Sequence, residues 1–138
     1  MTTQNLSLEH LIQPSSLTEK APLIIMLHGY GSNENDLFSF ASELPDEYLI
    51  VSAKAPLPMQ PYGNAWYETN FDADQNKFTN DKQAIASRDL IAKFIDEVIE
   101  AYHADANQVT LLGFSQGAIL SYAVALSYPE KVNRVVAL

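Results

Sequence analysis

With 138 residues, of which 47% are apolar and 18% charged, the chain has the size and composition of one ordinary globular domain with a substantial core. Its formal net charge of −9 argues against nucleic acid and anionic membrane surfaces as partners. The sequence contains no run of roughly 18 apolar residues that would span a bilayer, and we expect no signal peptide, because the first residues are not basic and apolar. There is no cysteine, which excludes disulfides, thiolate metal sites and cysteine nucleophiles and fits a cytoplasmic location.

The first half of the sequence predicts three strands and one short helix. Alternating apolar residues over 6–12 indicate a half-exposed antiparallel strand near an edge of the sheet, with His10 packed toward the core. The continuous apolar runs 22–27 and 48–53 are typical of strands buried on both faces of a parallel sheet. Between them, the apolar residues over 33–44 favour a short helix.

A glycine-rich loop, His-Gly-Tyr-Gly-Ser at 28–32, follows the second of these strands. Two glycines at the C-terminal end of a strand let the backbone turn and aim an N–H group at a ligand. The alternative is a plain glycine turn, but four of the five glycines lie in this loop and in the motif around Ser115. We expect His28 to orient the loop by hydrogen bonding rather than to act as a base.

A long segment, 56–80, precedes the next helix and contains Trp66 and Tyr67. A loop of this length in a compact domain is more often functional than idle. The two aromatic residues therefore either form the wall of a substrate pocket or pin the loop to the body of the domain. The sequence leaves both alternatives open.

The second half of the chain alternates helices and strands. A helix over 81–102 has one apolar stripe and one charged face, which we interpret as a solvent-exposed surface. A strand that ends at Gly113, a helix over 116–127 and a further strand over 131–138 follow. This order indicates the α/β class, with a mainly parallel sheet that has helices on both faces. No repeat or linker divides the chain.

The motif that organises the chain is Gly113-Phe114-Ser115-Gln116-Gly117, which lies between an apolar strand and a helix. Gly-x-Ser-x-Gly in this context is the nucleophile elbow of an α/β hydrolase, in which a strained turn presents the serine hydroxyl above the edge of the sheet. Gly113 and Gly117 fit the motif because the helix packs so close to the strands that a side chain would clash. The N–H of Gln116 lies at the helix N-terminus, where it favours an oxyanion.

Together with Ala65-Trp66-Tyr67 and the 28–32 loop, this motif resembles the phospholipase/carboxylesterase family of α/β hydrolases, which includes the acyl-protein thioesterases. The resemblance spans the whole chain and implies hydrolysis of carboxylic esters or thioesters without a metal or other cofactor. By position, Ser115 matches the nucleophile, and the backbone N–H groups of Tyr30 and Gln116 match the oxyanion hole. Members of the family often have leucine in place of Tyr30, which changes the pocket wall but keeps the N–H. The candidates for the substrate pocket are His28, Gly29, Trp66 and Tyr67.

The rest of a catalytic triad has no match in the sequence. In this fold the acid and the histidine follow the serine along the chain, but after Ser115 there is no histidine or aspartate, and the only acid, Glu130, precedes the last strand. We therefore expect residues 1–138 to be the N-terminal part of a single domain that lacks its last strands, about 60 to 80 residues. Because a serine without a base is a weak nucleophile, we expect this chain alone to be nearly inactive.

Other interpretations stay open. A peptidase or an acyltransferase uses the same elbow, and loss of the acid and base would suit a non-catalytic binding module of the α/β-hydrolase type. His28 is the one histidine near the C-terminal edge of the sheet that would substitute for the base. The expected partner is a small ester or thioester substrate. The exposed edge of the last strand would pair readily with another chain, which makes a homodimer a candidate.

Overall fold

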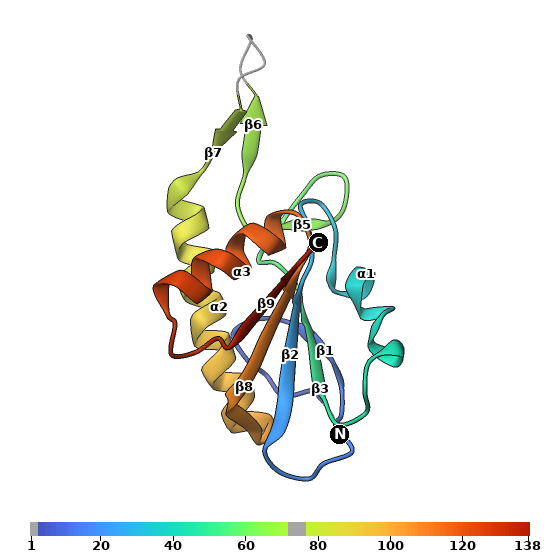
Figure 1. Cartoon of the computed structure of the whole chain (residues 1–138). Helices are drawn as coiled ribbons and strands as arrows, with labels where there is room; N and C mark the ends of the chain where they lie inside the picture. The colour runs from blue at the N-terminus through green and yellow to red at the C-terminus, as the bar shows by residue number, and fades with distance from the viewer. Residues whose placement is uncertain (1–2, 72–76) are drawn as a thin grey trace.

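A five-stranded sheet forms the centre of the molecule (Figure 1). The computed structural model describes residues 3–71 and 77–138. The strands of the sheet are β1 (His10–Gln13), β2 (Ala21–Leu27), β3 (Leu49–Ala53), β8 (Ala104–Gly113) and β9 (Arg134–Ala137). They lie in the order β1-β3-β2-β8-β9, and all neighbours are parallel except β1, which runs antiparallel to β3 at one edge. The mainly parallel sheet and its antiparallel edge strand are confirmed.

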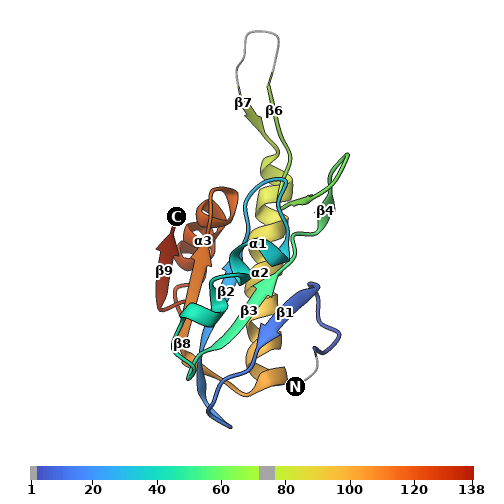
Figure 2. The ribbon, with the colours of Figure 1, turned by 90° about the vertical axis from the view of Figure 1, so that its right-hand side faces the viewer.

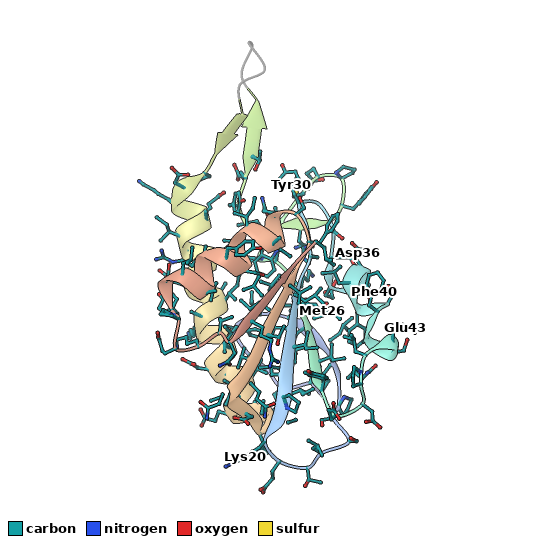
Figure 3. All side chains as sticks on the ribbon, in the orientation of Figure 1. Lys20, Met26, Tyr30, Asp36, Phe40 and Glu43 are labelled. Carbon is teal, nitrogen blue, oxygen red and sulfur yellow. The ribbon has the colours of Figure 1, made fainter. Side chains whose placement is uncertain are left out.

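Helices cover both faces of this sheet, as the view in Figure 2 shows. Two long helices pack on one face, and a short α-helix with a 3-10 turn packs on the other: α2 (Asp81–Tyr102) and α3 (Gln116–Ser127), against α1 (Glu34–Phe38) and η1 (Ala41–Glu43). Side chains along β2 alternate between two cores, so that Ile25 joins the core with α2 and α3, whereas Met26 joins the smaller core with α1 (Figure 3). The prediction of helices on both faces is confirmed.

Two elements differ from the sequence predictions. The first strand begins at His10 instead of residue 6, because Ser7 binds the carboxylate of Glu97 on α2 through both its N–H and its hydroxyl and does not join a strand ladder. The helix expected over 33–44 ends at Phe38, since the chain then tightens into i→i+3 hydrogen bonds such as that from the N–H of Phe40 to the carbonyl of Leu37.

The segment 56–80, which we expected to be a loop, contains two short antiparallel strand pairs. They are β4 (Leu57–Pro58) with β5 (Asn64–Ala65), and β6 (Thr69–Phe71) with β7 (Lys77–Thr79). The β6–β7 pair projects from the body at the end of the sheet where β2 ends (Figure 1). In each pair, the backbone groups of one strand supply hydrogen-bond partners to those of the other.

Helix α2 spans the residues that the sequence predicted. The side chain of Asn80 caps its first turn by accepting from the N–H of Gln83, and His103 ends the helix in a left-handed conformation. Most of the predicted apolar stripe is buried, but Ile85 is 51% exposed. In residues 3–71 and 77–138, no helix has the length together with the apolar character of a membrane span.

Gly117 marks the place where α3 touches the end of β2. A Cβ built on Gly117 would lie 2.0 Å from the carbonyl oxygen of Leu27, and backbone cannot move aside as a flexible side chain can. We expect Gly117→Ala to lower the free energy of unfolding by about 3 kcal/mol or more, measured by urea denaturation.

The matched control for this substitution is Gly31→Ala. A Cβ on Gly31 meets nothing within 4 Å, and its φ of 77° is the only source of strain. That strain costs about 1 to 2 kcal/mol. Equal losses in the two variants would contradict the view that close backbone approach is what excludes a side chain from the first turn of α3.

Candidate active site

Ser115 occupies the turn between β8 and α3 with a strained backbone. Its φ of 55° and ψ of −114° form a combination that residues other than glycine rarely adopt, and such a residue typically costs about 1–3 kcal/mol. The residue is exposed, and its side chain makes no capping hydrogen bond to α3. The close approach that the motif predicted is present too, since a Cβ on Gly113 would lie 2.4 Å from the carbonyl oxygen of Gly117.

The glycine-rich loop after β2 lies directly against this turn. A Cβ built on Gly29 would lie 3.4 Å from the Cβ of Ser115 and 3.3 Å from the carbonyl oxygen of Phe114. The N–H of Phe114 donates to the carbonyl of Leu27 at 3.1 Å, which extends the pairing of β2 and β8 into the turn. Two motifs that are far apart in the sequence therefore meet at one end of the sheet.

The backbone N–H groups of Tyr30, which follows Gly29, and of Gln116, which follows Ser115, make no hydrogen bond to any other described residue. The next N–H in each segment is bonded, because Gly31 donates to the carbonyl of Asn64 and Gly117 donates to that of Phe114, each at 2.9 Å. Gln116 is the first residue of α3, so the helix dipole adds to the positive potential at its N–H. Tyr30 lies at the end of the sheet opposite Lys20 (Figure 3).

His28 is only 1% exposed, and both nitrogens of its ring are occupied. Nε2 accepts from the N–H of Ala55 at 3.0 Å, so Nδ1 carries the proton and donates to the carbonyl of Gly29 at 2.8 Å. Burial lowers the pKa of His28, against the raising effects of the Gly29 carbonyl and of the carboxylates Glu34 and Asp36. A neutral ring without a free nitrogen holds the loop and has no means of taking a proton from the serine.

Trp66 and Tyr67 attach the segment between β3 and α2 to the body of the domain. The amide side chain of Gln116 accepts from the N–H of Trp66 and donates to the carbonyl of Tyr67, both at 2.8 Å. The indole N–H of Trp66 donates to the carbonyl of His28 at 2.8 Å. These contacts fit the second alternative that the sequence left open, in which the two aromatic residues attach the segment to the body of the domain. Tyr67 also borders a hollow of about 250 Å³ between α2 and α3, which Ser115 does not line, so a role in the pocket wall stays a prediction.

The sequence did not indicate two further contacts around this turn. One is made by the side chain of Gln116 with the backbone of Trp66 and Tyr67. The other is made by the turn at Gly63 and Asn64, where the N–H of Asn64 donates to the carbonyl of Ser32 at 2.8 Å. Gly63 was the available signal, because it is the one glycine outside the two motifs. Its φ of 87° and its contact with the backbone of Gly31 explain why a glycine is needed there.

The other two histidines lie away from Ser115. His10 Nε2 is bonded to the hydroxyl of Tyr102 at 2.7 Å, and its Nδ1 is bonded to a backbone carbonyl. His103 ends α2, and its carbonyl accepts from the N–H of Lys20 at the far end of the sheet. Within the described ranges, no group of three or more His, Cys, Asp or Glu side chains is placed to hold a metal ion.

The sequence profile of the phospholipase/carboxylesterase family matches residues 9–138. The chain belongs to this family. The resemblance drawn from the glycine-rich loop, the Trp66-Tyr67 pair and the elbow is thereby confirmed, and so is the α/β-hydrolase fold.

Relatives of known structure share this architecture. The fold matches that of a carboxylesterase from Mesorhizobium loti with a TM-score of 0.82 and 23% identity, over 98% of this chain and 62% of the other. For Zea mays acyl-protein thioesterase 2 the TM-score is 0.66 and the identity 22%, over 94% and 60% of the two chains. In sequence, the chain is 27% identical over 123 residues to an uncharacterised hydrolase of Mycosarcoma maydis, covering 85% of this chain and 46% of that protein. The chain thus spans 46% to 62% of the length of these three proteins.

The buried, neutral ring of His28 links stability to pH. Because its pKa is lowered in the folded state, the unfolded chain takes up a proton near the ordinary value of 6.5 while the folded chain does not. The contribution of the neutral ring is complete above that pH and is lost as the pH falls below it, by at most about 1.4 kcal/mol per pH unit.

We expect His28→Gln to show a shallower fall in stability than the wild type between about pH 7 and about pH 5, measured by urea denaturation at each pH. The matched control is His103→Gln, which replaces an exposed histidine and is measured against the same wild-type slope. If His28→Gln kept that slope as well, the ring would have to accept a proton within the folded protein.

Proposed function

We propose that this protein is a serine hydrolase of carboxylic esters or thioesters, with Ser115 as its nucleophile. The observation that carries the proposal is the meeting of three features at one end of the sheet. These are a strained, exposed serine and two N–H groups, from separate motifs, that have no partner among the described residues. Membership of the phospholipase/carboxylesterase family supports the same chemistry.

The reaction that this geometry suits is transfer of an acyl group to the serine and then to water. Ser115 Oγ attacks the carbonyl carbon while a base takes the hydroxyl proton, and the carbonyl oxygen becomes an oxyanion. The N–H groups of Tyr30 and Gln116 donate to that oxyanion, each contributing about 3 kcal/mol to the transition state. The intermediate then expels the alkoxide or thiolate, which takes the proton from the base. Water, deprotonated by the same base, releases the acid and restores the serine.

None of the three histidines, all of which lie among the described residues, is placed to act as the base in this mechanism. His28 has both ring nitrogens occupied and His10 is bonded to Tyr102, so neither reaches Ser115 among the described residues. We propose that the base and its orienting acid come from a part of the domain outside these residues, and that this chain alone is nearly inactive. The share of its relatives' length that the chain spans, 46% to 62%, supports this view.

The partners of the protein follow from the same proposal. The substrate is a small ester or thioester, and no cofactor takes part in the mechanism. A homodimer and a cytoplasmic location stay predictions from the sequence. The dimer has a physical basis in β9, which lies at an edge of the five-stranded sheet and pairs only with β8 among the described strands.

Replacement of Ser115 by alanine tests the proposed nucleophile. In protein produced from the native gene, we expect hydrolysis of a p-nitrophenyl ester and of an acyl thioester, and a fall in kcat of roughly ten-thousandfold in Ser115→Ala. Release of nitrophenol or thiol measures both. Ser127→Ala, at the exposed C-terminal end of the same helix, should keep full activity. Absence of turnover in the wild type, or unchanged turnover in Ser115→Ala, would favour the non-catalytic binding module instead.

Two substitutions of Tyr30 separate its backbone from its side chain. Tyr30→Leu keeps the N–H and alters only the 43% exposed side chain, so we expect kcat to change little and KM to change with the acyl group. Tyr30→Pro removes the donor, and we expect kcat to fall by roughly a hundredfold to a thousandfold. Steady-state kinetics measures both, and circular dichroism checks that each variant is folded. Equal kcat values for the two variants would rule out the backbone N–H as a donor.

A further inference from the structure

We infer that the turn at 63–67 is a positioning element that holds the two oxyanion donors, Tyr30 and Gln116, in one fixed arrangement. The hydrogen bonds of the Gln116 side chain connect this element to the second donor. The role rests on the proposed function, because the spacing of the two N–H groups matters to the reaction only if an oxyanion forms between them.

One half of this turn holds the loop that carries Tyr30. The carbonyl of Asn64 accepts from the N–H of Gly31 at 2.9 Å, and the N–H of Asn64 donates to the carbonyl of Ser32 at 2.8 Å. A Cβ on Gly63 would lie 2.1 Å from the carbonyl oxygen of Gly31, so the two backbones are in direct contact. The two residues after Tyr30 are therefore fixed to the turn at 63–67.

The other half of the turn holds Gln116. Its amide is bonded through both of its polar atoms, with Oε1 accepting from the N–H of Trp66 and Nε2 donating to the carbonyl of Tyr67. All three residues are buried, at 4%, 0% and 5% exposure for Gln116, Trp66 and Tyr67. The backbone N–H and the side chain of Gln116 share one Cα, so anchoring the amide fixes the position of the donor as well.

The indole of Trp66 joins the two halves. Its N–H donates to the carbonyl of His28, two residues before Tyr30. The turn thus binds the glycine-rich loop on both sides of Tyr30, and its backbone binds the side chain of Gln116. The two motifs also meet directly, through the hydrogen bond from the N–H of Phe114 to the carbonyl of Leu27 and through the contact of Gly117 with the same carbonyl, and neither contact involves Tyr30 or the side chain of Gln116.

We expect loss of this positioning to lower the rate of the reaction and to leave substrate binding nearly unchanged. Two donors from distant segments must both point to one oxygen, and a displacement of about 1 Å at a reacting centre costs roughly a hundredfold in rate. A side chain that sets this distance acts when charge develops on the oxygen, so its loss lowers kcat and leaves KM near its original value.

Gln116→Met tests the positioning role, because it keeps the length of the side chain and the backbone N–H while removing both amide atoms. In protein produced from the native gene, we expect kcat to fall by roughly tenfold to a hundredfold, with KM within about twofold of the wild type. The matched control is Tyr102→Phe, which removes another buried polar group, bonded to His10 and to the N–H of Gln4 near the far end of α2. The control should lose a comparable amount of thermal stability and keep its kcat.

A second readout does not depend on turnover. In a two-dimensional ¹⁵N–¹H spectrum, Gln116→Met should shift or broaden the amide resonance of Tyr30, which is distant in sequence, while Tyr102→Phe should leave it in place. An unchanged Tyr30 resonance, or an equal loss of kcat in both variants, would overturn the inference. If the wild type shows no Ser115-dependent turnover, the proposed function fails and the Tyr30 resonance alone decides the coupling. Should Gln116→Met not fold, Trp66→Phe removes the indole N–H and gives the same readouts.

Discussion

The close contact between the backbone at the end of β2 and the first turn of α3 is the constraint on which the rest of the site depends. Because Gly117 lies against the carbonyl of Leu27, the chain has to reverse direction within two residues of the end of β8, and Ser115 takes a strained conformation as a result. The strain of about 1–3 kcal/mol is offset by the helix that follows. Leu120 and Val124 on α3 are buried at 2% and 0% exposure, and each such side chain contributes about 1.5–3 kcal/mol.

A second constraint is that the polar groups around this turn are buried. The amide of Gln116, the ring of His28 and the indole N–H of Trp66 would each cost free energy if they lacked partners in a dry environment. Among the side chains that the structure describes, no buried nitrogen or oxygen lacks a hydrogen bond. The N–H groups of Tyr30 and Gln116, which make no hydrogen bond to any other described residue, are the proposed donors to the substrate.

The sequence predicted the parts of the fold that repeat regularly. Helix α2 follows from the helical spacing of its apolar stripe, and the strands β2 and β3 follow from continuous apolar runs, which are typical of strands buried on both faces. The elbow at Ser115 was also predictable, since its glycines report local crowding that any sequence in this turn must avoid.

The contacts of the segment 56–80 were not predictable in the same way. The bonds from Gln116 to Trp66 and Tyr67 join a side chain to backbone groups about fifty residues away, and such bonds leave no period and no composition in the sequence. The sequence therefore singled out Trp66 and Tyr67 but did not show which contacts they make. Similarly, the predicted start of β1 was wrong, because Ser7 donates to the carboxylate of Glu97 on a distant helix and does not pair with a neighbouring strand.

One consequence concerns how such a protein can change over evolutionary time. Both proposed donors are main-chain N–H groups, which every residue except proline carries. Tyr30 itself is 43% exposed, so its side chain is free to vary. Under the proposed function, a single codon change at position 30 therefore alters the side chain beside the donors and leaves the backbone N–H in place. If the protein acts as proposed, its lineage is free to exchange one substrate for another in small steps, because the two donors belong to the backbone and the surface beside them is formed by side chains.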